Sequence, residues 1–141
     1  EENGFLNVVK NTKLLGRWQI LNENPLIIAD TAHNKDGLEI VMKQISEQKF
    51  TDLYIVFGLV NDKDLSEVLP LMPKNAKYFI AKPNVPRGLE VSILEDKMKE
   101  YGLVLEVCAS IPEAFEGAKA VAKANDMIYV GGSTFVVAEV L

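Results

Sequence analysis

The feature that most restricts the fold of this chain is a repeated alternation of short apolar runs with amphipathic segments. Mainly apolar runs of four or five residues occur at 26–29, 53–57, 77–81, 104–108 and 126–130. The segment Lys35–Glu47, which follows the first run, has Leu38, Val41 and Ile45 at helical spacing. Strands that are apolar on both faces are typical of parallel sheets covered by helices. We therefore predict a three-layer α/β/α fold with a mostly parallel sheet of about six strands.

The first strand of this Rossmann-like sheet is predicted to be an antiparallel edge strand. Trp18–Leu21 alternates weakly and is separated from the run Leu26–Ala29 by the turn residues Asn22–Pro25, which favours a hairpin. Residues 1–14 are polar with few apolar positions, and we interpret them as a linker or lead-in. Residues 15–141 are then a single domain.

Helix-breaking and capping residues set the predicted ends of the helices. Asn34 or Asp36 is expected to cap the helix Lys35–Glu47, and Ser110 is expected to cap a later one. Gly102 is expected to end a helix at its C-terminus. The further helices are predicted at Asp62–Leu71, Glu90–Tyr101, Pro112–Ala124 and Thr134–Leu141.

Composition excludes several classes of protein. Hydrophobic residues make up 48% and charged residues 25% of the 141 residues, which is typical of one globular domain. The net charge of −5 argues against nucleic acid or an anionic membrane as the main partner. No apolar stretch reaches the ~18 residues that span a bilayer. The single cysteine, Cys108, lies in an apolar run, so we expect a buried structural thiol and a cytoplasmic location.

The two ends of the sequence suggest that it is a piece of a longer protein. The chain begins without Met, and it stops at Val140 and Leu141 while it is still apolar. No signal-peptide pattern is present.

Candidate functional residues follow the apolar runs, because ligands of open α/β sheets bind at the carboxyl ends of the strands. Asp30 ends the run 26–29, and a buried acid needs a partner or a ligand. Its carboxylate could bind a ribose or cap the following helix. His33 is the only histidine, and without other ligands nearby we discount zinc and favour a structural or binding role. The acids of Asp62–Asp64 are interpreted as helix caps.

The turn Gly131–Ser133 lies at a strand–helix junction, where backbone N–H groups can bind an anion. The chain contains neither a GxxxxGK[ST] nor a GxGxxG motif. If this domain meets a nucleotide, we therefore expect that it does not hold the phosphates alone.

Four of these stretches, in this order, carry a family resemblance. They are Leu15-Gly16-Arg17-Trp18-Gln19, Asp30-Thr31-Ala32-His33-Asn34, Phe57-Gly58 with Asp62-Lys63-Asp64, and Gly132-Ser133. They resemble motifs of the C-terminal domain of the Mur ligase superfamily, most closely that of the folylpolyglutamate synthase/dihydrofolate synthase family. The resemblance extends from Leu15 to the end of the chain.

The resemblance implies part of an ATP-dependent amide ligase, inactive in isolation. Such enzymes phosphorylate the carboxylate of dihydropteroate or of a folate, and the amine of glutamate then attacks the acyl phosphate. A central domain, absent from this sequence, is expected to carry the phosphate-binding loop and the Mg²⁺ sites. The present domain would close over ATP and the amino acid. Its partners would be that central domain, glutamate, and folate or dihydropteroate.

The same resemblance assigns roles to four residues. Arg17 would reach the ATP phosphates and act in catalysis, where its guanidinium suits developing charge. Asp30 would bind the ATP ribose or orient Arg17. His33 and Ser133 would lie towards the incoming glutamate, with His33 also a candidate catalytic residue. No metal ligand is assigned to this domain.

Two alternatives remain open from the sequence. One is a free-standing α/β module that binds a nucleotide or another small molecule without catalysis. The other is the C-terminal domain of a different superfamily member, such as a cell-wall Mur ligase or a ligase resembling cyanophycin synthetase. A GxxxxGK[ST] motif upstream in the reading frame would support a ligase.

Overall fold

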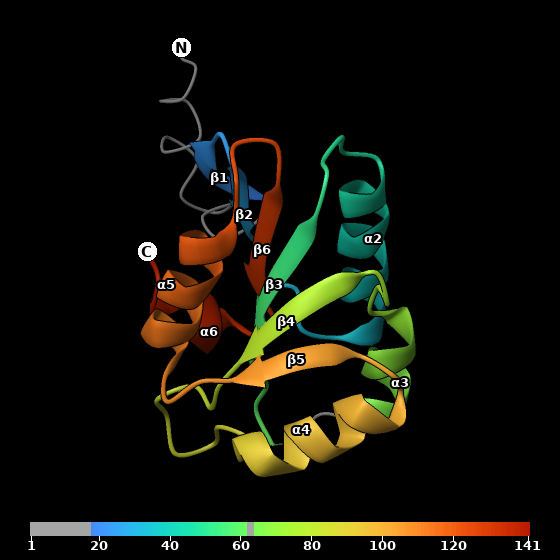
Figure 1. The fold of residues 1–141 in the computed structure, drawn as a ribbon. Coiled ribbons are helices and arrows are strands. Elements are labelled where there is room, and N and C mark those ends of the chain that lie inside the picture. The colour runs from blue at the N-terminus through green and yellow to red at the C-terminus, as the bar shows by residue number, and fades with distance from the viewer. Residues whose placement is uncertain (1–17, 62–63) are drawn as a thin grey trace.

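A six-stranded sheet forms the centre of the computed structural model, which describes residues 18–61 and 64–141. The strands are β1 (Gln19–Glu23), β2 (Leu26–Ala29), β3 (Leu53–Phe57), β4 (Ala76–Ile80), β5 (Val104–Val107) and β6 (Met127–Gly131). Their order across the sheet is β1-β2-β6-β3-β4-β5 (Figure 1). Only β1 pairs antiparallel with its neighbour, β2, while the other neighbouring strands are parallel. The predicted architecture and its antiparallel edge strand are confirmed.

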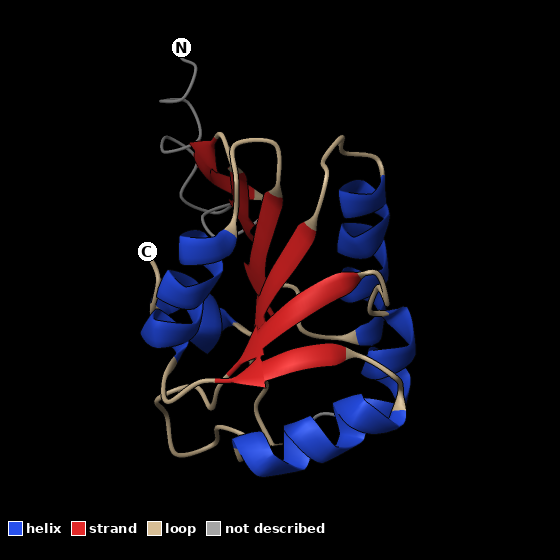
Figure 2. Ribbon diagram, in the orientation of Figure 1, coloured by secondary structure: helices blue, strands red, loops and turns tan. Residues whose placement is uncertain are grey.

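Helices cover both faces of this sheet (Figure 2). They are α2 (Lys35–Ser46), α3 (Leu65–Val68) with the 3₁₀ helix η2 (Leu69–Leu71), α4 (Val91–Glu100), α5 (Ile111–Val121) and α6 (Thr134–Ala138). The first four of these pack on one face and contribute to one hydrophobic cluster, while α5 and α6 pack on the other. None of the described helices is long and apolar enough to cross a membrane.

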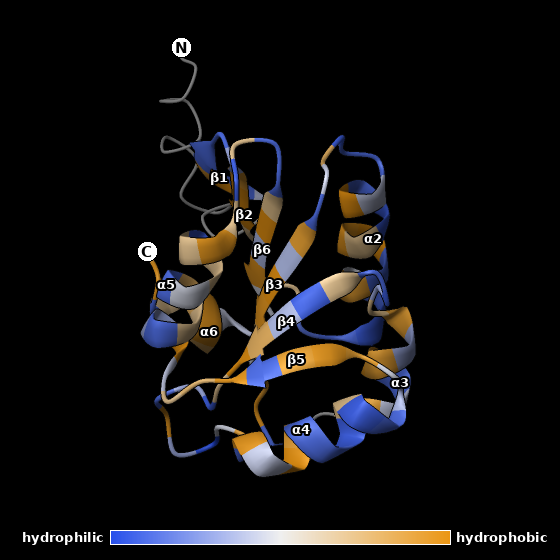
Figure 3. Cartoon of the chain, in the orientation of Figure 1, coloured by the Kyte–Doolittle hydropathy of each residue, from blue (hydrophilic) through white to orange (hydrophobic). Residues whose placement is uncertain are grey.

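The core is a pair of hydrophobic layers that share the sheet. Colouring by hydropathy shows apolar residues along the central strands and on the sides of the helices that face them (Figure 3). Ile28, Tyr129 and Ile55 form a row of fully buried side chains across β2, β6 and β3. Each fully buried apolar side chain of this size contributes about 1.5–3 kcal/mol. This rigid centre holds the carboxyl ends of the three strands at fixed spacing.

Most of the predicted helix caps are confirmed. The side chain of Asn34 accepts a hydrogen bond of 2.8 Å from the Gly37 N–H at the start of α2. The Ser110 hydroxyl accepts one of 3.2 Å from the Glu113 N–H at the start of α5. Gly102 directly follows the C-cap of α4.

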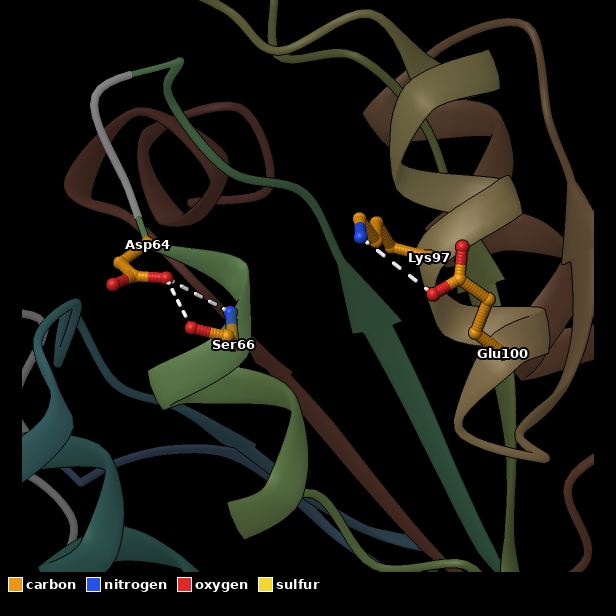
Figure 4. Close-up of polar contacts among 4 residues, drawn as sticks. All are labelled: Asp64, Ser66, Lys97 and Glu100. Atoms are coloured by element: carbon orange, nitrogen blue, oxygen red, sulfur yellow. Dashed lines mark hydrogen bonds and ion pairs between the residues drawn. The ribbon is translucent and has the colours of Figure 1, made fainter.

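The helix predicted at Asp62–Leu71 is shorter than expected. It begins at Leu65, with Asp64 as its cap, and it tightens into the 3₁₀ helix that contains Pro70. One carboxylate oxygen of Asp64 accepts hydrogen bonds from the Ser66 N–H and hydroxyl at 3.0 and 2.6 Å (Figure 4). These bonds lower the pKa of Asp64. Asp62 and Lys63 lie outside the described residues. The helix predicted at the chain end is shorter too, because α6 stops at Ala138.

The prediction that Cys108 is a buried thiol is wrong. Its side chain is half-buried, because β5 is an edge strand whose Val104 and Val107 are 59% and 41% exposed. An apolar run therefore does not distinguish an edge strand from a central one. Burial, together with the carboxylates of Glu106 and Glu113, raises the pKa of this thiol.

We expect alkylation of Cys108 by iodoacetamide near neutral pH to be slower than that of a free thiol. The thiolate is the reactive form, and the raised pKa lowers its fraction at a given pH. The rate should rise as pH increases towards the raised pKa. Mass spectrometry of the labelled protein, with glutathione as the reference thiol, measures this ratio. A rate equal to or above that of glutathione at pH 7 would contradict the expectation.

Candidate active site at the carboxyl edge of the sheet

The carboxyl ends of β2, β6 and β3 lie side by side. Ala29 pairs with Val130, and Phe57 pairs with Gly131, so the loops that follow these strands emerge next to one another. The helix after β6 covers the opposite face from the helices after β2 and β3. Connections that leave in opposite directions create a crevice at the strand ends, where ligands of such sheets bind. The predicted positions Asp30, His33 and Ser133 all belong to these loops.

Asp30 fastens the end of β2 to the start of the edge strand. Its side chain is only 3% exposed. One carboxylate oxygen accepts a 2.7 Å hydrogen bond from the Trp18 N–H, and the other accepts a 2.8 Å bond from the Ala32 N–H. Hydrogen bonds to a charged group contribute about 1.5–3 kcal/mol each. The alternative that Asp30 caps the following helix is wrong, since the cap is Asn34.

Trp18 is held at the other end of this bond in an unusual backbone conformation. Its φ is +46°, in the left-handed region that a bulky residue rarely adopts. Its side chain packs against the core cluster on the α2 face. The N–H bond to Asp30 and this packing fix where the edge segment begins. Arg17, the residue before Trp18, lies outside the described residues.

His33 is exposed on the rim of the crevice. Its Nδ1 lies 3.3 Å from the Thr31 carbonyl oxygen. The side chain lines a surface pocket of about 200 Å³, together with Asp30 and the α2 residues Ile40 and Gln44. An exposed imidazole in such a pocket can bind a ligand or exchange a proton with it.

Ser133 is buried at the start of α6. Its exposed fraction is 3%, and its hydroxyl oxygen accepts a 3.1 Å hydrogen bond from the Val136 N–H. A hydroxyl that accepts a bond can still donate one. Among the described residues no acceptor takes the Ser133 hydrogen. The residue therefore caps α6 and keeps a donor near the crevice.

The loops after β3 and β4 are joined to each other beside this crevice. The Asn61 N–H donates to the Arg87 carbonyl oxygen at 2.7 Å, and Val60 forms an isolated bridge with Gly88. The Asn84 N–H donates to the Glu139 carboxylate at 2.8 Å, just beyond α6. Hydrogen bonds thus join the loops after β3 and β4 to each other and to the residue that follows α6.

Gly132 lets the loop after β6 approach the loop after β3. Its φ is +108°, and a Cβ at this position would collide with the Gly58 carbonyl oxygen and touch the Phe57 ring. A side chain here would push Ser133 away from the strand ends.

We expect Gly132→Ala to destabilise the protein by about 2 kcal/mol or more, because it adds a collision to a strained φ. Gly102→Ala is the matched control, since Gly102 has φ +76° but nothing within 4 Å of its Cβ position. Urea unfolding should show a clearly larger loss for Gly132→Ala. Equal decreases in the free energy of unfolding would show that the close contact with Gly58 does not affect stability.

Metal ligands are not clustered in the described part of the chain. No group of three or more His, Cys, Asp or Glu residues there could hold a metal ion.

Two contacts in the site were not predicted from the sequence. The first contact is the hydrogen bond from the Trp18 N–H to the Asp30 carboxylate. It depends on a backbone turn that no sequence pattern predicts. The second contact is the hydrogen bond that the Tyr129 hydroxyl donates to the Asp30 carbonyl oxygen. One feature of the sequence could have indicated it. A tyrosine in an otherwise apolar central run needs a partner for its buried hydroxyl.

The sequence matches one protein family over most of its length. Residues 16–134 match the family described as "Mur ligase, glutamate ligase domain". The chain is 30% identical over 132 residues to a probable bifunctional folylpolyglutamate synthase/dihydropteroate synthase of Haloferax volcanii, covering 93% of this chain and 16% of that protein. It is 30% identical over 142 residues to the dihydrofolate synthase/folylpolyglutamate synthase of Escherichia coli K12, covering 99% of this chain and 33% of that protein.

A solved structure agrees with the fold and with the family. E. coli FolC in complex with DHPP and ADP superposes with a TM-score of 0.82 at 29% identity, covering 99% of this chain and 33% of that one. The present chain thus spans a third or less of the length of these relatives. The family match includes the motifs at 30–34 and 132–133, which the structure brings to one crevice. The chain therefore belongs to the family of Mur ligase glutamate ligase domains.

Proposed function

We propose that this chain is the C-terminal domain of an ATP-dependent ligase that adds glutamate to a carboxylate of folate or dihydropteroate. The observation that carries the proposal is the match to the glutamate ligase domain family over residues 16–134. The names of the relatives and the ADP in the FolC structure support it. The whole enzyme would include a central domain with the phosphate-binding loop and the Mg²⁺ sites.

The proposed reaction has two steps. A carboxylate oxygen of the acceptor attacks the γ-phosphorus of ATP, and ADP leaves. The glutamate amine then attacks the acyl carbon, phosphate leaves with the acceptor oxygen, and the nitrogen loses a proton. The contribution of this domain would be to close over the nucleotide and amino acid, which excludes water from the reactive acyl phosphate.

Asp30 and Arg17 would act together at the nucleotide. Both carboxylate oxygens of Asp30 already accept backbone N–H bonds, and the side chain is buried. Of the two roles considered, orientation of Arg17 therefore has more support than binding of the ribose. Asp30 would hold Trp18, and with it the segment that carries the Arg17 guanidinium to the phosphates. A guanidinium stabilises charge that develops during phosphoryl transfer.

His33 and Ser133 would face the incoming glutamate. The exposed imidazole of His33 could accept a proton from the amine or bind a carboxylate. The hydroxyl hydrogen of Ser133 would donate to a carboxylate oxygen. His33 lies on the loop after β2, and Ser133 lies on the turn after β6. The ends of these two strands are paired, so both residues lie at the same crevice.

The test is ligation by the full-length protein from which this domain comes. ADP release and glutamyl product should both require ATP, glutamate and a folate or dihydropteroate acceptor. Omission of any one should abolish product. Product only with a UDP-linked peptide acceptor would place the enzyme among the cell-wall ligases instead. Nucleotide binding without product from any acceptor would support a non-catalytic module.

A further inference from the structure

Tyr129 lies beneath the site but has no role in the reaction described above. It is the middle residue of β6, flanked by Ile28 of β2 and Ile55 of β3, and its side chain is fully buried. A buried hydroxyl is costly unless it forms a hydrogen bond. The same ring position filled by phenylalanine would avoid that cost. The buried hydroxyl therefore needs a hydrogen-bond partner among its neighbours.

The Tyr129 hydroxyl contacts the ends of two neighbouring strands. It donates to the Asp30 carbonyl oxygen at 3.4 Å. It also lies against the Cα of Gly131, since a Cβ there would collide with the hydroxyl and ring of Tyr129. Asp30 begins the loop that carries His33, and Gly131 begins the turn that carries Ser133. One side-chain oxygen thus touches the base of both loops.

The Tyr129 hydroxyl acts as a hydrogen-bond donor in this position. Burial, and after it the nearby Asp30 carboxylate, raise the pKa of Tyr129, which favours the protonated hydroxyl near neutral pH.

We propose that Tyr129 is a positioning residue, whose hydroxyl sets the spacing between the loop 30–34 and the turn 131–133. Through that spacing it would place His33 and Ser133 on the same glutamate. The proposal rests on the function proposed above, because that function assigns the same substrate, glutamate, to both loops. The ring packs at the base of the crevice, so its effect is transmitted through the backbone of Asp30 and Gly131.

Tyr129→Phe in the full-length enzyme tests this without creating a large cavity. Tyr78→Phe is the matched control. Tyr78 is also fully buried in the same core cluster, and its hydroxyl donates to the Pro73 carbonyl oxygen at 2.6 Å, before β4 begins. A purely structural role predicts similar results for both variants. A positioning role predicts a kinetic effect for Tyr129→Phe alone.

We expect Tyr129→Phe to raise the KM for glutamate about fivefold, with a smaller change in the KM for ATP, as loss of one ordinary hydrogen bond would allow. Tyr78→Phe should leave both KM values unchanged. It should lower the unfolding midpoint at least as much as Tyr129→Phe does. Amide hydrogen exchange, measured on the same proteins, should be faster for both Ala32 and Val136 in Tyr129→Phe than in Tyr78→Phe.

The outcomes separate this proposal from the function on which it rests. Unchanged KM values and unchanged exchange in Tyr129→Phe would overturn the positioning role while the enzyme remains a ligase. Equal fivefold effects in both variants would overturn it too, since they would show general destabilisation. A wild-type protein without ligase activity would refute the proposed function and the glutamate part of this proposal. Faster exchange at both loops would still support their coupling through Tyr129.

Discussion

Replacement of Asp30 by asparagine is expected to lower the kcat/KM for ATP of the full-length enzyme by roughly tenfold to a hundredfold. This factor corresponds to the loss of one hydrogen bond to a charged group. The carboxylate accepts from the Trp18 N–H and the Ala32 N–H at once. An amide has only one acceptor oxygen, so its NH₂ group would face one of the two N–H donors. If the Trp18 bond is lost, the start of the edge segment is no longer fastened to Asp30, and the role proposed for Arg17 depends on that fastening.

Asp126→Asn is the matched control for this experiment. Asp126 is also buried, and its two oxygens accept from the Asp52 N–H at 3.1 Å and the Lys123 N–H at 2.8 Å. It lies just before β6, at the amino edge of the sheet, away from the crevice. Asp126→Asn should destabilise the protein to a similar degree but leave kcat/KM nearly unchanged. Equal kinetic losses in the two variants would show that Asp30 acts only through stability.

Arg17→Ala is expected to lower kcat by about tenfold or more, because a guanidinium that stabilises developing phosphate charge acts in the transition state. An exposed salt bridge would contribute at most about 1 kcal/mol, and its loss would leave turnover nearly intact. Arg17→Lys keeps the charge but loses the planar fork, so it should recover only part of the rate. Steady-state kinetics with saturating ATP measures the difference. An unchanged kcat in Arg17→Ala would remove this residue from the site.

The double variant Asp30→Asn/Arg17→Ala links these two results. If Asp30 works by holding the segment that carries Arg17, then little remains to be lost once Arg17 is absent. The double variant should therefore be close to Arg17→Ala in kcat/KM. Residues that act as one unit show such non-additive effects. Losses that multiply would instead assign Asp30 a separate contact with the nucleotide.

The central strands and the start of α2 could be predicted from the sequence almost residue by residue. Leu26–Ala29 and Leu53–Phe57 have the predicted bounds, because a strand buried on both faces must be apolar throughout. The Asn34 cap was found because few residue types can accept the first N–H groups of a helix. Helix length was harder to predict, since α3 ends early at the 3₁₀ turn around Pro70.

The positions of the candidate residues at the strand ends could be predicted, but their contacts could not. Asp30, His33 and Ser133 follow strand ends, and parallel pairing brings those ends together. The fastening of Asp30 to Trp18 joins residues that are 12 positions apart and depends on the tertiary fold. The place of β6 between β2 and β3 also decides that Ser133 lies beside Asp30, and short apolar runs do not reveal strand order.

Transfer of a heavy-oxygen label tests the central claim most directly. The acceptor folate is prepared with heavy oxygen in its carboxylate and incubated with the full-length enzyme, ATP and glutamate. An acyl-phosphate ligase should release phosphate that carries one labelled oxygen for each glutamyl product, as read by mass spectrometry. Product accompanied by unlabelled phosphate would contradict carboxylate phosphorylation and with it the proposed function of this domain.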